Sequence, residues 1–364
     1  MLNNKLSRFP DLPQKILLVI LFLVLMFPGS AYSGDPETNH RAALGDLSLD
    51  DLLKLEVTLV NVLGTHTHLE DEWMIGYQFK TMKMDGNRSG TQDLSVAEVH
   101  SPFAVAPLEM TMDMHMPMVM YAPTDHLTFM AMVPYIRKEM DHLTRTGVRF
   151  TTQSEGWGDL QLSSLYMVLG SPGDLHTLIL NGGFSIPTGS IDKKDIQANP
   201  SLGELKLPYP MQLGSGTVDL LPKLTYLGEG ENWAWGLEAS AVVRLGENSN
   251  SYTLGDRYNY STWVNWKFKD YLAPYIKIDG SFWENIAGAD PDLNPLLVGT
   301  ADPLKQAGER VDLSFGVNFY LDKGNFKGLR LGLQGGFPLY QSLDGPQLKV
   351  TRILSLGINF TRAF

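Results

Sequence analysis

Methionine and histidine are the residues whose type and spacing suggest chemistry in this sequence. Six methionines occupy every second position between Met110 and Met120, and the 364-residue chain holds 16 methionines and 8 histidines but no cysteine. Thioether and imidazole groups are soft to borderline ligands that suit Cu(I) in an oxidising compartment. The sequence therefore raises the hypothesis of a copper ion, or another soft metal, bound by Met82, Met84, Met110, Met112, His115, Met140 and His142.

The alternative is that these methionines only pack. A period of two places them on one face of a β-strand, while Asp113 and His115 lie on the other, mostly polar face. Methionine is a flexible apolar side chain that fills irregular gaps. If the apolar face contacts lipid, Met114 and Met116 point outward and His115 points into water. Both hypotheses remain open at this point.

Other kinds of chemistry find little support in the sequence. It contains no HExxH motif, nucleophile elbow or phosphate-binding loop, so we do not expect an enzyme. A barrel-wall hydrolase with a non-contiguous Ser–His pair, drawing on His100, His126, His142 or His176, is the third hypothesis. The net charge of −11 and pI near 5.2 argue against nucleic acid. The absence of cysteine excludes a disulfide framework and thiolate metal sites.

The first residues predict export. Lys5, Arg8 and Lys15 precede an apolar run, 16–27, that is too short to span a bilayer, and small residues follow it at 31–33. We therefore expect a signal peptide over 1–33, and a mature protein in the outer membrane. Residues 34–71 are predicted to form a periplasmic leader with a short helix. Whether the leader caps or enters the barrel stays open.

From residue 72 onward the chain breaks into alternating segments of the length that crosses an outer membrane. Closed barrels suit lipid because every backbone polar group pairs with a neighbouring strand. The prediction is an all-β, transmembrane antiparallel barrel over 72–364 with about twelve strands. The alternation of short and long links argues against a soluble β-sandwich. The expected strands are 72–84, 108–121, 126–138, 158–169, 175–186, 216–227, 232–246, 257–269, 271–283, 310–322, 327–340 and 350–364.

The faces of these strands suggest a wet interior and an apolar exterior in contact with outer-membrane lipid. Near residue 312, for example, acidic and hydroxyl side chains alternate with apolar ones, and charge is costly on the lipid side. We expect the lumen to be lined, and its selectivity set, by Asp159, Glu238, Arg244, Lys277, Asp279, Asp312 and Arg330. The terminal Phe364 is predicted to be the signal recognised by the barrel assembly machinery.

Several motifs resemble one known family. They include Glu72–Tyr77, Met82–Arg88, Phe184–Ser190, Leu207–Gly216 and Tyr340–Pro346. These segments resemble the large family of outer-membrane barrels associated with the meta-pathway of phenol degradation, over residues 60–364. The resemblance implies a barrel that transports solutes, with substrates that are mostly unassigned.

The sequence thus predicts an outer-membrane channel or transporter for small-molecule solutes, with hydrophobic or aromatic compounds as candidates. A component of copper or soft-metal handling, using Met and His at the external rim, is the alternative. Titration with metal would separate the second function from the first, and turnover of ester substrates would separate the hydrolase.

Overall fold

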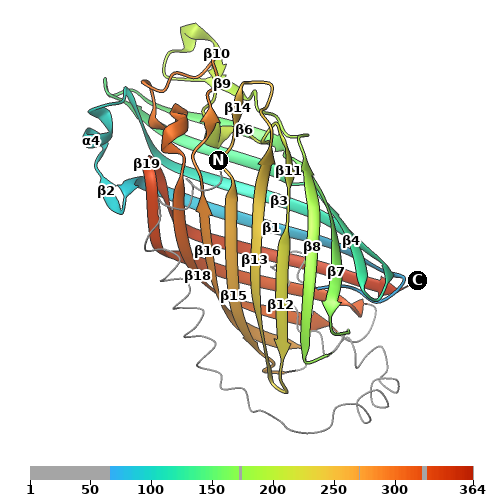
Figure 1. Ribbon diagram of the computed structural model, residues 1–364. Coiled ribbons are helices and arrows are strands. Elements are labelled where there is room, and N and C mark those ends of the chain that lie inside the picture. Colours follow the sequence, from blue (N-terminus) through green and yellow to red (C-terminus); the bar gives the residue numbers. More distant parts are fainter. Residues whose placement is uncertain (1–65, 172–173, 270, 322–325, 364) are drawn as a thin grey trace, which may run out of the picture. The chain divides into compact units, whose positions relative to one another are not determined.

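A single antiparallel sheet, closed on itself, forms the body of the molecule (Figure 1). The computed structural model describes residues 66–171, 174–269, 271–321 and 326–363. The ring closes because β1 pairs with both β19 and β3. Its strands are β1 (Glu72–Gly90), β3 (Val105–Thr124), β4 (Leu127–Met132), β5 (Tyr135–Thr144), β6 (Arg149–Trp157), β7 (Leu160–Leu169), β8 (His176–Ile186), β11 (Val218–Leu220), β12 (Lys223–Glu229), β13 (Trp233–Leu245), β15 (Arg257–Trp266), β16 (Leu272–Trp283), β18 (Gly308–Leu321) and β19 (Leu329–Ala363).

The predicted antiparallel barrel is confirmed, but the number of strands differs from twelve. Three strands of the ring are each interrupted once and so consist of two consecutive segments: β4 and β5, β6 and β7, and β11 and β12. With each pair counted once, and the long β19 also counted once, eleven strand elements form the ring within the described residues. The difference arises because the predicted break between 340 and 350 is absent, and β19 runs without interruption over 35 residues.

The sequence did not predict β6 as a strand. β6 precedes the predicted fourth strand and pairs with β5 to form a hairpin. The ladder is interrupted beside this hairpin at Pro134, which has no N–H to donate, and at Gly158, whose own N–H bonds the Pro134 carbonyl at 2.7 Å. The sequence of β6 is mostly polar, so it lacks the apolar alternation that identifies a strand in lipid.

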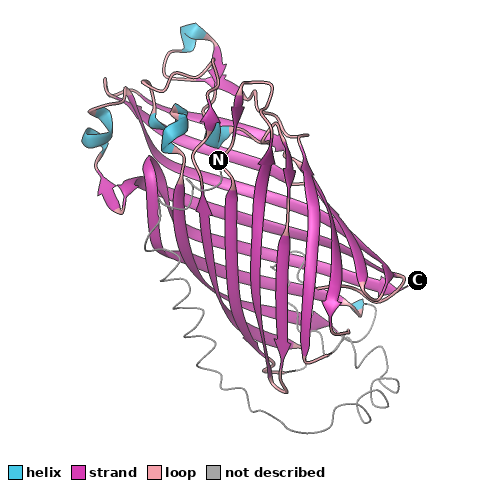
Figure 2. Ribbon diagram, viewed as in Figure 1, coloured by secondary structure: helices cyan, strands magenta, loops and turns pink. Residues whose placement is uncertain are grey.

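Short elements gather at one end of the barrel, which we call the loop end (Figure 2). The opposite end, where most strands are joined by brief turns, is the turn end. At the loop end lie β2 (Gln92–Leu94), α4 (Val96–His100), β9 (Lys194–Ile196), η3 (Pro200–Leu202), β10 (Glu204–Lys206), η4 (Tyr209–Met211), β14 (Tyr252–Thr253), β17 (Ala287–Gly288), η5 (Gly299–Ala301) and η6 (Pro303–Lys305). The sequence therefore places its long connections together, as alternation of short and long links predicted.

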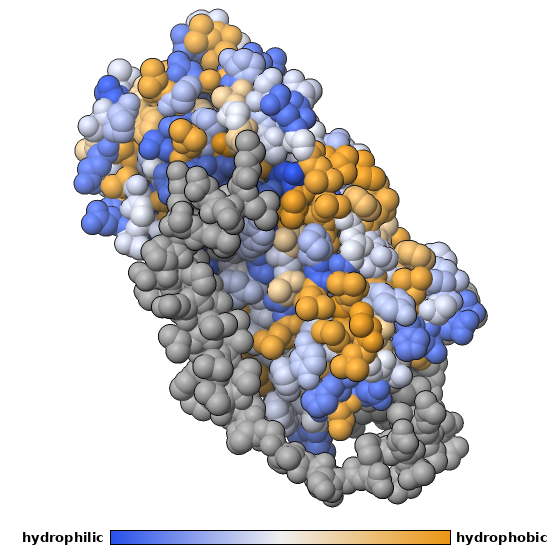
Figure 3. Space-filling model, viewed as in Figure 1, coloured by the Kyte–Doolittle hydropathy of each residue, from blue (hydrophilic) through white to orange (hydrophobic). Residues whose placement is uncertain are grey.

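The outer wall is apolar where the strands are longest. On the face shown in Figure 3, apolar side chains gather over the front strands, and hydrophilic ones are more frequent toward the loop end. Exposed side chains such as Leu224, Val264 and Phe315 contribute to this wall. No helix in the described ranges is long and apolar enough to span a membrane. The predicted signal peptide, the leader helix and Phe364 lie outside the described residues.

Candidate functional site

The methionine row faces the inside of the barrel. In the register between β1 and β3, Met74 lies opposite Met120 and Gln78 opposite Met116. Met116, Met118 and Met120 retain only 7%, 5% and 1% of their accessible surface. They form one buried cluster together with Met74, Met132, Leu165 and Ile179. The expectation that Met114 and Met116 contact lipid is therefore wrong.

The alternate positions of the same strand face outward. On this side Ile75 is 67% exposed and Val119 is 37% exposed, as expected for a wall in lipid. His115 also lies here, beside Phe79 with ring centroids 5.0 Å apart, so its predicted place in the lumen is wrong. The error has a physical cause: the polar residues of this face belong to its loop-end half, where a strand needs no apolar surface.

Paired charges line the other side of the lumen. Lys277 contacts Asp279 at 2.7 Å, and on the next strand Arg310 contacts Asp312 at 2.9 Å. Glu238 pairs with Lys223 at 3.2 Å. The carboxylate of Asp219, fully buried, pairs with Arg244. These four ion pairs contribute no net charge, because each joins one cation to one anion.

Five of the seven predicted lumen residues belong to those pairs. Arg330, 4% exposed, is also an inward residue, whereas Asp159 contacts a loop. Arg330 lies near the turn end, with its guanidinium 5.7 Å from the ring centre of Tyr320. Asp159 accepts hydrogen bonds from the backbone N–H groups of Gly189 and Ser215 at 2.9 and 2.8 Å. Its observed contact is thus with a loop. Sequence reasoning missed the partners Asp219, Lys223 and Arg310, although the strand alternation could have found them.

A long connection, residues 187–217, folds against the inward face near the loop end. Lys138 donates from Nζ to the carbonyl of Pro210 at 2.8 Å, and Ser154 donates from Oγ to the carbonyl of Met211 at 2.7 Å. Both donors belong to the inward rows of β5 and β6. The short helix η4 is therefore held inside the rim, where it narrows the lumen.

Six of the seven predicted metal ligands share this region. Met84 lies opposite Met110, which lies opposite Met140, and Met82 lies opposite Met112 one position deeper. Except for Met82, these methionines belong to an apolar cluster with Leu207, Met211 and Leu348. No group of three His, Cys, Asp or Glu side chains in the described residues is arranged to hold a metal ion. A methionine-based copper site stays a prediction, and His115, on the outer wall, is not part of this cluster.

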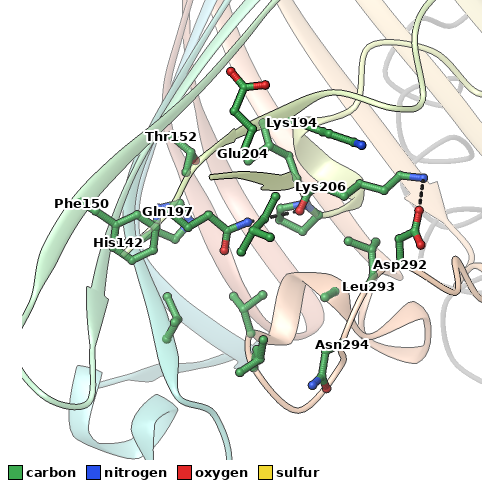
Figure 4. A pocket seen from close by; sticks show the side chains of 17 residues that line it. His142, Phe150, Thr152, Lys194, Gln197, Glu204, Lys206, Asp292, Leu293 and Asn294 are labelled. Atoms are coloured by element: carbon green, nitrogen blue, oxygen red, sulfur yellow. Dashed lines mark hydrogen bonds and ion pairs between the residues drawn. The ribbon is translucent and has the colours of Figure 1, made fainter. Parts of the chain in front are cut away.

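A pocket lies at the loop end (Figure 4). Its volume is about 460 Å³. We call it the mouth pocket; it is lined by Val105, His142, Phe150, Thr152, Lys194, Gln197, Glu204, Leu205, Lys206, Leu207, Pro208, Asp292, Leu293, Asn294, Leu297, Val298 and Ala301. Leu207 belongs both to the mouth pocket and to the methionine cluster. The mouth pocket and the inner methionine face are therefore contiguous.

The first described residues lie at the turn end of the same lumen. His66 and His68 are buried, at 5% and 2% exposure. The backbone N–H of His68 donates to Oγ1 of Thr128 at 3.0 Å, and Nδ1 of His68 lies 3.5 Å from the carboxylate of Glu72. Since Thr128 and Glu72 belong to the inward rows, the segment just before β1 lies against the inner wall.

Comparisons with known proteins agree with this architecture. The solved structure of the COG4313 outer membrane channel from Pseudomonas putida F1 is similar, with a TM-score of 0.57 and 14% identity, over 83% of this chain and 99% of that chain. The TodX monoaromatic hydrocarbon channel, as the deltaS2 mutant, matches with a TM-score of 0.41 and 11% identity, over 85% and 93%. No curated protein matches the chain. Residues 95–293, more than half of the sequence, match the family described as "Putative MetA-pathway of phenol degradation", and the chain belongs to that family.

Proposed function

We propose that the protein is an outer-membrane channel for small apolar and aromatic solutes. The observation that supports this most directly is the unbroken apolar inner face, which begins at Leu207 in the mouth pocket. It continues through the cluster of Met110, Met140 and Met211. Met112 and Met114, on β3, connect this cluster to the buried cluster at the turn end. The buried members of both clusters are 0–7% exposed, so an apolar solute that follows this face would have to pass between packed thioether and aliphatic groups.

The rest of the lumen supports a selective passage over a general pore. Thioether side chains adapt to ligands of different shape, since methionine is unbranched and polarisable. The facing wall is polar, and each of its four ion pairs joins one cation to one anion. A long connection narrows the loop end. The interior of a general porin, by contrast, is polar and filled with water.

The proposal is tested by uptake in intact cells, where the lipopolysaccharide leaflet slows apolar solutes. We expect cells that produce the protein to take up radiolabelled toluene faster than cells that lack it, and to show no difference for a labelled disaccharide. Met116→Gln keeps the volume but adds a polar group to the inner face, so it should reduce toluene uptake several-fold. Met116→Leu, which keeps the face apolar, is the matched control. Equal uptake by both variants would refute the path.

We infer that β19 crosses the membrane twice, which restores twelve crossings. Its residues 329–343 pair with β18 and its residues 343–363 pair with β1, and every pair in the ring is antiparallel. A ring that contains only antiparallel pairs needs an even number of strands. We place the loop end outside the cell and both termini in the periplasm. A tag inserted at Asn248 should then be accessible on intact cells.

Export and assembly complete the proposal. A signal peptide over 1–33 would export the chain, residues 34–71 would form a periplasmic leader with a short helix, and Phe364 would be recognised by the barrel assembly machinery. Deletion of Phe364 should lower the amount of folded barrel in the outer membrane. An undiminished amount would exclude this residue as the signal.

The second candidate function is soft-metal handling, favoured by one observation. Met84, Met110, Met112, Met140 and Met211 belong to a single cluster, which brings five thioethers together. We expect a Cu(I) titration of the purified barrel to be saturable if these groups bind metal, and to lose saturation in Met110→Leu. Binding that is equal in Met110→Leu and the unaltered protein would exclude the cluster as a copper site.

A further inference from the structure

Two cations on the inner wall have neither an ion-pair partner nor a hydrogen-bond partner among the described residues, and Lys80 is the first. It occupies an inward position of β1, directly opposite Met114 of β3. The charges that act on it from β16 and β18 are those of Asp279, Lys277, Arg310 and Asp312. Both of these carboxylates are paired with their own cations, so the charge of Lys80 stays uncompensated.

Arg257 is the second of these cations, at the loop-end start of β15. It belongs to the inward row of this strand, which also contains the buried Trp263. Its guanidinium carbon lies 5.2 Å from the ring centre of Trp283 on the neighbouring strand. The charges that act on it are both positive, those of Arg310 and Arg244. A carboxylate partner is therefore missing here as well, within the part of the chain that the structure describes.

Arg310 is a common neighbour of Lys80 and Arg257, so the excess charge is concentrated on one part of the wall. Five cations in this part accompany three carboxylates: Lys80, Arg244, Arg257, Lys277 and Arg310 against Asp219, Asp279 and Asp312. Lys80 is half-buried, and a cation that loses hydration without gaining a partner destabilises the folded protein. A neutral side chain would avoid that cost. The arrangement is therefore that of a binding site whose anion supplies the missing partner.

An apolar surface begins directly beside Lys80, because the two methionine clusters meet opposite it. Met112, one inward position nearer the loop end, packs on the cluster that contains Met110. Met114, opposite Lys80, packs on the turn-end cluster that contains Met116. Thioether side chains adapt to apolar groups of different shape. A positive charge and a continuous apolar face thus border the same part of the lumen.

We propose that the lumen binds an amphipathic organic anion, a molecule with one carboxylate at the end of an apolar chain. The carboxylate pairs with the ammonium group of Lys80, and the chain lies along the inward thioethers of Met112 and Met114. Arg257, nearer the loop end, attracts the anion into the lumen. The inference rests on the proposed function and extends it from neutral apolar solutes to those that carry a single negative charge.

The test measures binding of [1-¹³C]octanoate to the full-length barrel in non-ionic detergent by ¹³C NMR, with empty micelles as the baseline. We expect saturable binding that unlabelled octanoate displaces. Lys80→Met keeps the approximate length of the side chain but removes the charge. Octanoate should then bind about tenfold more weakly, the loss of one hydrogen bond to a charged group. Binding of [1-¹³C]octan-1-ol, which is neutral, should not fall.

Two controls separate the charge from the apolar face. Lys83→Met should leave octanoate binding unchanged, since Lys83 lies on the outward face of the same strand and pairs with Glu109 at 3.3 Å. Acetate, which lacks the chain, should bind the unaltered protein more weakly than octanoate by roughly tenfold or more. Urea unfolding should show no loss of stability in Lys80→Met, because this variant removes an uncompensated charge.

The proposal is overturned if octanoate shows no saturable binding, if Lys80→Met binds it as tightly as the unaltered protein does, or if acetate binds as tightly as octanoate. These outcomes are distinct from those of the uptake experiment. Octanoate binding that depends on Lys80, with toluene uptake unaffected by Met116→Gln, would refute the channel for neutral solutes and leave the anion site. Absence of octanoate binding, with toluene uptake lowered by Met116→Gln, would refute the anion site and leave the channel.

Discussion

The hydroxyl group of Tyr77 lies 2.7 Å from Nδ1 of His115, on the outward faces of β1 and β3. The ring centroids of His115 and Tyr135 are 6.5 Å apart, and Tyr135 lies beside Trp157 at 5.3 Å. Aromatic side chains of this kind mark the boundary of the lipid-facing band in membrane barrels. His115 is therefore a rim residue of the outer wall. The flanking Met114 and Met116 point into the barrel.

The first prediction concerns the depth of the outward residues. Ile75→Lys should lower the free energy of unfolding by roughly 2–4 kcal/mol, because it puts a charge near the middle of the lipid-facing band. His115→Lys, at the rim, should cost about 0–1 kcal/mol. Urea unfolding in lipid vesicles measures both. Equal losses would place His115 deep in the membrane and contradict the boundary.

A second prediction concerns a glycine under an aromatic ring. A Cβ at Gly236 would overlap the ring of Trp263, which is 4% exposed on the inner face. Gly236→Val should therefore destabilise the barrel by about 1–3 kcal/mol through overpacking. Gly182→Val is the matched control, since nothing lies within 4 Å of a Cβ at Gly182. Tryptophan fluorescence during urea unfolding reports both variants, and a neutral Gly236→Val would show that the ring can move away.

The third prediction concerns the connection that narrows the lumen. Asp159 accepts hydrogen bonds from the N–H groups of Gly189 and Ser215 and from Oγ of Ser215 at 3.0 Å. Each bond to a charged group contributes about 1.5–3 kcal/mol, so Asp159→Ala should raise the population of the displaced connection at least tenfold. Single-channel conductance in planar bilayers should rise. Asp141→Ala, which loses one exposed bond to Thr151, should leave conductance unchanged.

A fourth prediction concerns the pH dependence of the loop end. The hydrogen bond from Lys206 lowers the pKa of Asp192. A carboxyl group with a lowered pKa in the folded state stabilises that state above its unfolded pKa, about 3.9, and the contribution disappears as pH falls through the folded value. We therefore expect protection of residues 192–206 from proteolysis at neutral pH to decline in acid.

The same ion pair acts in the opposite direction on the lysine. Burial tends to lower the pKa of Lys206, but its hydrogen bonds to Asp192 and Asp290 outweigh burial and raise it. Its contribution is complete below an unfolded pKa of about 10.4 and declines as pH rises through the folded value. Lys206→Met should remove both pH dependences. If the acid-induced decline persists in Lys206→Met, the pair is not its cause.

The sequence by itself determined the architecture. The alternation of side chains around residues 110–120 and 310–321 is a local property of a strand, and the regular change between short and long links orders the strands along the chain. Both features survive in the structure, with β3 and β18 close to their predicted positions. The sequence also identified charged inward residues such as Asp279 and Asp312, because charge on the lipid side is too costly.

Tertiary structure alone decided which face of the methionine strand is inside. Alternation defines two faces, but an apolar face is equally compatible with lipid and with an apolar lumen. Contacts with other parts of the chain decide that this face points inward. Met74 and Met132 pack around Met118 from other strands, and Leu207 packs on Met110 from a distant connection. Such contacts join residues far apart in sequence, so no local pattern contains them.

The mouth pocket could not be predicted from the sequence, for the same reason. His142 was considered as a metal ligand, but its stacking partner Phe150 lies on β6, a mostly polar strand that alternation does not reveal. Lys206 and Leu293 reach the pocket from two further segments. Closing the sheet into a barrel brings these segments to one rim, and that closure gives the polar nitrogen of His142 an apolar, enclosed surrounding.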